Sequence, residues 1–315
     1  MKNLILSIVN YDYTDLDRFF ISLSKTGYTG HICVFAGPNS NVSYMQKLAS
    51  MGVEIISFTT SFPFISDPHP DNFKSLPNPI SLFNYRHFLY YDYLLKNQFQ
   101  FANVLLTDIR DVVFQQEPFS LLKENSLYVA LENALLGSCK YHENWILAGY
   151  DYPVWENLKK ERMSCAGTTM GPVYHVMRYL KTMLQEVLKI KDALECVDQA
   201  AHNVLLYRGA LEPTVRMDNR DGLIMTIGIY QDPANLRFDK KGYVLGSDYK
   251  RAYIIHQGDR HMSSTIKMDK FIFNHNLLEY IKKKEIRLFA MSLYFNNPIV
   301  VKSWRFIKQM LFIKQ

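Results

Sequence analysis

Short apolar runs alternate with amphipathic stretches along the N-terminal part of the chain. Each run has the length of a strand buried on both faces, and the segments between them repeat apolar positions with helical spacing. The first such segment opens at Thr14 and ends at Gly27, a residue that commonly terminates helices. The rhythm predicts a parallel, doubly wound sheet. Its predicted strands cover 4–9, 31–35 and 53–58, and a second predicted helix covers 43–51.

The remainder of the chain continues the mixture of helices and strands. Pro, Ser and Asp dominate 61–79 without periodicity, which predicts a long loop of the kind that often carries function. A second loop is expected at 133–145. Helical patterns cover 82–95, 174–188 and 198–207, and strands are expected at 104–106, 126–130, 222–229 and 252–256.

Composition excludes several classes of protein. With 48% hydrophobic and 21% charged residues, the 315-residue chain is globular and not disordered. Its four cysteines lie far apart with no metal-binding spacing, which argues against structural zinc and favours a reducing, cytosolic compartment. The apolar run at 4–9 is too short for a signal peptide, and no run approaches the length of a membrane span.

Two aspartates follow the apolar run Val104 to Leu106. Asp108 and Asp111 stand at the end of a predicted buried strand, where carboxylates are costly unless they meet a cation or hydrogen-bond donors. The ends of strands in an open α/β sheet are also where ligands bind. These aspartates therefore predict a divalent metal that holds a phosphorylated ligand. The alternative is that one caps the following turn and the other pairs with Arg110.

A second polar group follows the strand that ends at His256. Neutral imidazole at a strand end is a candidate third metal ligand, although a lone histidine is more often a structural residue. The adjoining Asp259, Arg260 and His261 favour a ligand, and Arg260 or Lys267 could meet a phosphate.

Two further segments are candidates for substrate contacts. Asp198 opens a predicted helix and is a natural N-cap, yet Asp198 or Gln199 could equally face a sugar. Small residues over 164–171 would permit close approach of a ligand to the backbone. The chain has no dinucleotide fingerprint, no phosphate-binding loop of the Walker type and no nucleophile elbow.

Taken in order, these segments resemble nucleotide-sugar glycosyltransferases with the GT-A fold. In that family a strand runs into an Asp-x-Asp motif, then a hydrophobic pair and a Pro turn. The stretch Leu-Leu-Thr-Asp108-Ile-Arg-Asp111-Val-Val-Phe-Gln-Gln-Glu-Pro is similar, but its motif is Asp-x-x-Asp. This difference leaves open which aspartate is the main metal ligand. The resemblance covers roughly residues 3 to 265 and is closest to a bacterial surface-polysaccharide subgroup (capsule, O-antigen or lipopolysaccharide).

The resemblance implies where the donor sugar would lie. The stretch Ala166, Gly167 and Thr168 looks like the family's Asn-Ala-Gly segment beside that sugar. Asp198-Gln199-x-x-x-Asn203 is similar to the Asp-Gln helix start of retaining galactosyl- and glucosyltransferases.

The same resemblance implies a nucleotide site. Asn10 and Tyr11 follow the first strand, where the family binds nucleobase and ribose. Arg86 looks like the arginine of a Tyr-x-Arg helix that helps to bind the donor, and His256 stands where the family places its third metal ligand.

The resemblance implies a GT-A catalytic domain over 1–275, an α/β fold with a Rossmann-like, mixed, mostly parallel sheet flanked by helices. Its expected activity is metal-dependent transfer of a hexose from a UDP-sugar to a hydroxyl of a growing, lipid-linked glycan. Asp108, Asp111 and His256 would hold Mn²⁺ or Mg²⁺ on the diphosphate. If the anomeric configuration inverts, Asp198 or Asp221 would deprotonate the acceptor, whereas retention needs no such base.

The net charge of +6 is concentrated near the C-terminus, where residues 281–315 hold eight Lys/Arg and one acid. Asn297-Pro298 starts a predicted helix in which Lys302, Arg305 and Lys308 form a basic stripe beside Trp304. Such a tail, over 276–315, favours the anionic cytoplasmic face of the inner membrane, and the alternative is a helix packed on the domain. No basic patch elsewhere points to nucleic acid.

Two rival functions remain open from the sequence. A nucleotidyltransferase acting on sugar phosphates also uses paired carboxylates, but would carry a glycine-rich basic loop where this chain has Asn10-Tyr-Asp-Tyr-Thr. A membrane-associated scaffold could keep the fold without catalysis.

Overall fold

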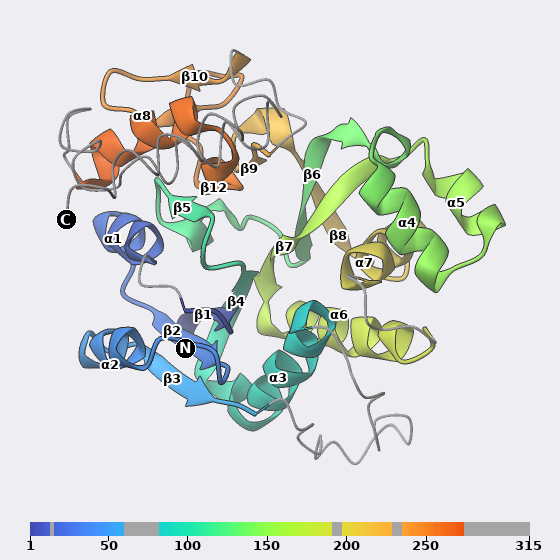
Figure 1. Ribbon diagram of the computed structural model, residues 1–315, viewed down its shortest axis with the longest axis horizontal. Coiled ribbons are helices and arrows are strands. Elements are labelled where there is room, and N and C mark those ends of the chain that lie inside the picture. Colours follow the sequence, from blue (N-terminus) through green and yellow to red (C-terminus); the bar gives the residue numbers. More distant parts are fainter. Residues whose placement is uncertain (13–15, 60–81, 191–196, 229–234, 274–315) are drawn as a thin grey trace, which may run out of the picture.

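The computed structural model describes residues 1–12, 16–59, 82–190, 197–228 and 235–273. At its centre is a seven-stranded sheet in the order β3-β2-β1-β4-β7-β6-β8 (Figure 1). All pairings in this sheet are parallel except those of β7, which runs antiparallel to both β4 and β6. The prediction of a mixed, mostly parallel α/β sheet is confirmed, and its form is compatible with a Rossmann-like fold. The strands are β1 (Lys2–Val9), β2 (His31–Ala36), β3 (Glu54–Ser57), β4 (Phe101–Thr107), β6 (Leu127–Leu135), β7 (Arg162–Pro172) and β8 (Thr214–Asp218).

Helices cover both faces of this sheet because its central strands are apolar on both sides. Successive side chains of a strand point to opposite faces, so Leu4 and Leu6 belong to one core and Ile5 to the other. The first core is closed by α3 (Leu82–Asn97), α6 (Val173–Val187) and α7 (Val197–Tyr207), and the second by α1 (Asp17–Lys25) and α2 (Val42–Ser50).

The segment after β6 corrects the predicted loop at 133–145. β6 continues to Leu135, and the 3-10 helix η4 (Leu136–Ser138), α4 (Lys140–Gly149) and α5 (Tyr152–Leu158) follow. These short helices bury few apolar residues of their own, such as Ile146, and pack them against Val204 of α7. A helix that relies on a distant partner leaves only a weak periodic signal in its own sequence.

A separate three-stranded sheet lies beyond the carboxyl ends of the central parallel strands. It pairs β5 (Val112–Phe114), β12 (Ile254–His256) and β9 (Ile224–Thr226) in the order β5-β12-β9. The predicted strands at 222–229 and 252–256 are therefore present but shorter. A hairpin of β10 (Arg237–Phe238) and β11 (Val244–Leu245) and the helix α8 (Met262–Phe273) complete this part (Figure 1).

Short 3-10 helices connect the remaining elements, at η2 (Gln98–Gln100), η3 (Pro118–Leu121), η5 (Asn219–Asp221) and η7 (Gly258–Arg260). No described helix is both long enough and apolar enough to cross a bilayer. The predicted tail at 276–315, its boundary with the catalytic domain and the predicted loop at 61–79 fall outside the described residues.

Candidate metal centre and adjoining cleft

Three strand ends bring the predicted metal ligands together. Asp108 follows β4, and Asp111 immediately precedes β5. His256 is the last residue of β12 and lies directly opposite Val112 in the antiparallel pairing of β12 with β5. This register places His256 beside Asp111, although the two residues are 145 positions apart in the sequence.

The ligand atoms of these residues converge on one point. Nε2 of His256 lies 3.3 Å from Oδ2 of Asp108 and 3.7 Å from Oδ1 of Asp111. One ligand atom from each of the three residues lies within 4.8 Å of the others. Two carboxylates and an imidazole are oxygen and nitrogen donors that suit Mn²⁺ or Mg²⁺. The geometry therefore fits the predicted metal, and this group could bind one.

The lack of a side chain at Gly167 lets Asp108 and His256 lie close to its backbone. A Cβ atom at this position would meet Oδ2 of Asp108 at 2.5 Å and Cε1 of His256 at 2.6 Å. The backbone is close as well, because the N–H of Asp108 donates to the carbonyl of Gly167 over 2.9 Å. The predicted approach of a ligand to the backbone of this small-residue stretch stays a prediction, and the neighbours of Gly167 in the structure are Asp108 and His256.

An irregularity in β7 creates this approach. Val129 of β6 lies opposite Thr169, whereas the next residue, Ala130, lies opposite Cys165. Three residues of β7, 166–168, are therefore extra relative to β6, as in an enlarged β-bulge. Ala166 and Thr168 flank Gly167 and are buried, so the bulge brings only Gly167 against the candidate ligands.

The charges in the cluster are strongly coupled. Burial opposes ionisation of Asp108, but Arg86 and His256 outweigh it and lower the pKa of this carboxyl. Burial raises the pKa of Asp111, and the neighbouring Asp108 and Asp259 raise it further. Burial would lower the pKa of His256, yet its contacts with Cys165, Asp108 and Asp111 raise it well above 6.5. The two carboxylates thus favour a positive charge at the place where the three ligand atoms meet.

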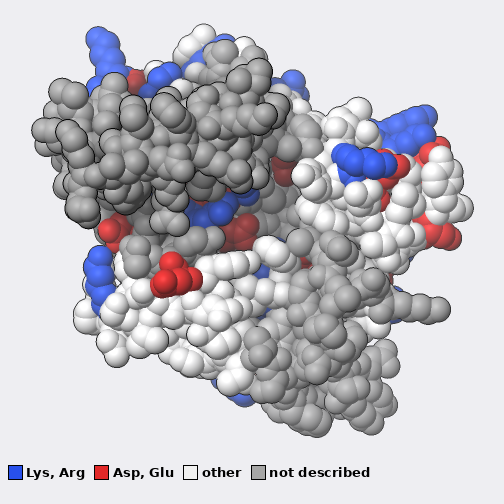
Figure 2. All heavy atoms as spheres, viewed as in Figure 1, with Lys and Arg blue, Asp and Glu red and all other residues white. Residues whose placement is uncertain are grey.

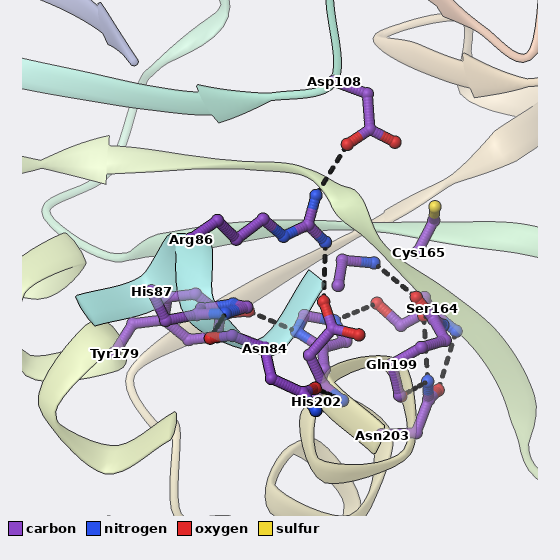
Figure 3. A network of polar contacts seen from close by, with 12 residues as sticks. Asn84, Arg86, His87, Asp108, Ser164, Cys165, Tyr179, Gln199, His202 and Asn203 are labelled. Atoms are coloured by element: carbon purple, nitrogen blue, oxygen red, sulfur yellow. Dashed lines mark hydrogen bonds and ion pairs between the residues drawn. The ribbon is translucent and has the colours of Figure 1, made fainter. Parts of the chain in front are cut away.

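Arg86 joins the metal cluster to a buried polar network. One end of its guanidinium donates to Asp108 over 2.6 Å and the other to Asp198 over 2.7 Å (Figure 3). The backbone N–H of Asp198 donates to the side-chain oxygen of Asn84, which ties α7 to α3. α7 begins at Val197, so Asp198 lies in its first turn, and its carboxylate is occupied by Arg86. Asp198 is only 1% exposed and therefore does not face an open sugar site.

Gln199 and Asn203, which follow Asp198 on α7, hold β7 in place. Gln199 accepts a hydrogen bond from the N–H of Ala166 and donates to the carbonyl of Ser164. Asn203 bonds to both the N–H and the carbonyl of Ser164 (Figure 3). Both amides lie next to the bulge that carries Gly167, so they position the segment expected to contact the sugar.

A cleft leads from the cluster to the end of β1. A cavity of about 270 Å³ is lined by Arg86, Asp108, Asp111 and Arg260. A second cavity, of about 640 Å³, is lined by Asn10 and polar residues of 38–41, and Tyr11 and Leu82 line both cavities. In Figure 2, basic and acidic side chains are visible together in a hollow near the middle of this face. Asn10, Tyr11, Asp108 and Asp111 thus line two adjoining cavities, and His256 lies buried behind the two aspartates.

Two predicted site residues line neither cavity. Asp221 is exposed at the end of η5, which precedes β9. Lys267 is exposed on α8, where its ammonium group lies 4.5 Å from the ring centre of Phe238.

Two further residues lie at the site. Arg110, the alternative partner considered for the aspartates, forms ion pairs with Asp111 at 3.5 Å and with Asp259 at 3.3 Å. Glu132 was not predicted. Glu132 is 7% exposed, and its burial raises its pKa to about 7 although His256 and Cys165 oppose the shift. An acid after the apolar run of β6 is the same signal that identified Asp108, and it could have identified Glu132.

No protein-family model matches this chain, and no curated protein shows significant similarity to it. The resemblance to GT-A glycosyltransferases therefore rests on the sequence motifs alone.

Proposed function

We propose that this chain is a metal-dependent GT-A glycosyltransferase that transfers a hexose from a UDP-sugar to a hydroxyl of a growing glycan. The observation that carries the proposal is the convergence of Asp108, Asp111 and His256, with the two aspartates lining one end of a cleft. The other end of that cleft lies against Asn10 and Tyr11. A nucleotide with a diphosphate needs such an arrangement, with a cation site at one end and a polar recess at the other.

Each part of the cleft has a proposed role. Asn10 and Tyr11 contact the nucleoside, and Arg260 and Arg86 add positive charge beside the diphosphate. Mn²⁺ or Mg²⁺, when bound, offsets the negative charge that builds on the UDP leaving group. Gly167 leaves space beside the ligands, and Gln199 holds its strand so that the donor sugar can lie against it.

The placement of Asp198 and Asp221, the two candidate bases, fits retention of the anomeric configuration better than inversion by either of them. Inversion requires a carboxylate that takes the proton of the acceptor hydroxyl. Asp198 is bound to Arg86 and Asp221 lines neither cavity, so neither is available for that task in this arrangement. Retention requires no such base.

Metal-dependent binding of UDP tests the core of the proposal. Calorimetry with wild-type protein should show UDP binding that needs Mn²⁺, and Asp111→Ala should abolish this Mn²⁺-dependent binding. Asp248→Ala is a matched control, because this aspartate is 45% exposed and pairs only with the neighbouring Lys250 in a turn. Binding of UDP without metal, or an unchanged Asp111→Ala variant, contradicts the metal centre.

A screen of sugar nucleotides with Mn²⁺ separates the rival functions. Release of UDP from one donor supports a glycosyltransferase and identifies the sugar. Formation of pyrophosphate from a nucleoside triphosphate and a sugar phosphate would instead indicate a nucleotidyltransferase. Metal-dependent UDP binding without turnover of any donor would indicate an inactive scaffold.

The location at the cytoplasmic face of the inner membrane is proposed from the sequence of 276–315. A lipid-linked acceptor would be concentrated there, and the basic residues would meet anionic headgroups. Sedimentation with anionic liposomes should be lost when the chain is truncated at Asn296. Full binding by the truncated chain contradicts this role of the tail.

A further inference from the structure

The ring of His256 has a second polar neighbour on the side opposite the aspartates. Its Nε2 faces Asp108 and Asp111, whereas its Nδ1 lies 3.4 Å from Sγ of Cys165. His256 is 1% exposed and Cys165 is 6% exposed, so no bulk water competes for this contact. In Figure 3 the sulfur of Cys165 points away from the Ser164 network, towards the side on which Asp108 lies.

A buried carboxylate lies near Cys165. Glu132 is 7% exposed on the adjacent strand β6, and burial raises its pKa although His256 and Cys165 favour the ionised form. The β7 bulge sets this arrangement, because it pairs Cys165 with Ala130, two residues before Glu132. Glu132, Cys165 and His256 are therefore buried together beside the candidate metal ligands.

A metal bound at this site would fix the tautomer of His256. Nε2 faces the two aspartates, so it is the nitrogen that would offer its lone pair to the metal and carry no hydrogen. Nδ1 of the neutral ring is then the protonated nitrogen, and the sulfur of Cys165 is placed to accept its hydrogen.

We propose that Cys165 is a positioning residue that holds His256 in the tautomer whose Nε2 binds the metal. Histidine ligands in proteins are commonly oriented in this way by a partner on the second ring nitrogen, usually an oxygen acceptor. Here a thiol takes that place. The inference rests on the metal centre of the proposed function.

Three cysteine variants of the full chain test the role of the thiol. Cys165→Ala removes the acceptor, whereas Cys165→Ser keeps a group that both accepts and donates. Cys139→Ala is the matched control, because Cys139 is equally buried but belongs to a separate apolar cluster with Leu136 and Ile146. Mn²⁺ affinity is measured by electron paramagnetic resonance, and circular dichroism checks that each variant is folded.

We expect Cys165→Ala to weaken Mn²⁺ binding about tenfold, the lower part of the range for such partners because sulfur is a weak acceptor. Cys165→Ser should recover most of the affinity, and Cys139→Ala should match wild type. The ¹⁵N chemical shift of His256, assigned by comparison with His256→Gln, gives a readout that does not depend on activity. With diamagnetic Mg²⁺ bound, it should show a protonated Nδ1 and an unprotonated Nε2.

The outcomes separate this inference from the proposed function. Wild-type Mn²⁺ affinity in Cys165→Ala, or an unprotonated Nδ1 in the Mg²⁺-bound wild type, overturns the inference and leaves the metal centre standing. Failure of the wild-type chain to bind Mn²⁺ overturns both.

Discussion

Loss of the Asp198 charge should destabilise the fold strongly, because Asp198 is the more deeply buried partner of Arg86. The side chains of Arg86 and Asp198 are 9% and 2% exposed, and their atoms lie 2.7 Å apart. Removal of one partner from a buried ion pair typically costs about 3–5 kcal/mol, since the remaining charge stays buried. Asp198→Asn preserves shape and leaves Arg86 its contact with Asp108, so we expect about 3 kcal/mol.

The matched control is Asp92→Asn, the same substitution in an exposed pair. Asp92 bonds to Lys96 one helical turn away, and that lysine side chain is 61% exposed. Such pairs contribute only about 0.3–0.5 kcal/mol. Urea denaturation and thermal denaturation, both followed by circular dichroism, measure the free energy of unfolding and the melting temperature of each variant. A difference of about 3 kcal/mol should lower the melting temperature of Asp198→Asn by roughly 6 °C relative to wild type.

Equal, small losses in the two variants would refute the reasoning. They would mean that desolvation of Arg86 and Asp198 cancels their attraction. A second test is the double variant Arg86→Met/Asp198→Leu, which removes both charges. It should be more stable than Asp198→Asn alone, because the buried guanidinium is then absent and Asp108, which is 35% exposed, keeps His256 as a partner.

Further predictions concern the metal site and the buried histidines. Gly167→Ala should weaken Mn²⁺ binding at least about tenfold, because the added methyl group displaces Asp108 and His256, and should cost only about 1–3 kcal/mol of stability. An unchanged affinity for Mn²⁺, measured by calorimetry, contradicts the steric argument. Burial lowers the pKa of His202 to about 3, so this histidine is neutral in the folded state and protonated in the unfolded state between pH about 3 and 6.5. Its contribution to stability is therefore present above pH 6.5 and lost as the pH falls, by at most about 1.4 kcal/mol per pH unit. In urea titrations at several pH values, His202→Gln should show a shallower loss than wild type, and parallel curves would contradict the assignment.

Local sequence was sufficient to predict the elements that depend on their own pattern. The apolar runs of β1, β2 and β4 are buried on both faces, and their composition alone identifies such strands. Asp108, Asp111 and His256 were predicted for a related reason. A polar residue directly after a buried strand has to lie at the edge of a sheet, and the carboxyl ends of parallel strands share that edge.

Tertiary structure decided which of these edge residues meet, and sequence could not. The opposition of His256 to Val112 and the bond between Arg86 and Asp198 join segments far apart in the chain. The displacement of Gly167 towards the ligands depends on a bulge in the pairing of β7 with β6, next to the residues of β7 that pair with β4. Such contacts are selected by the packing of the whole domain, because no local pattern of residues records the register between distant strands.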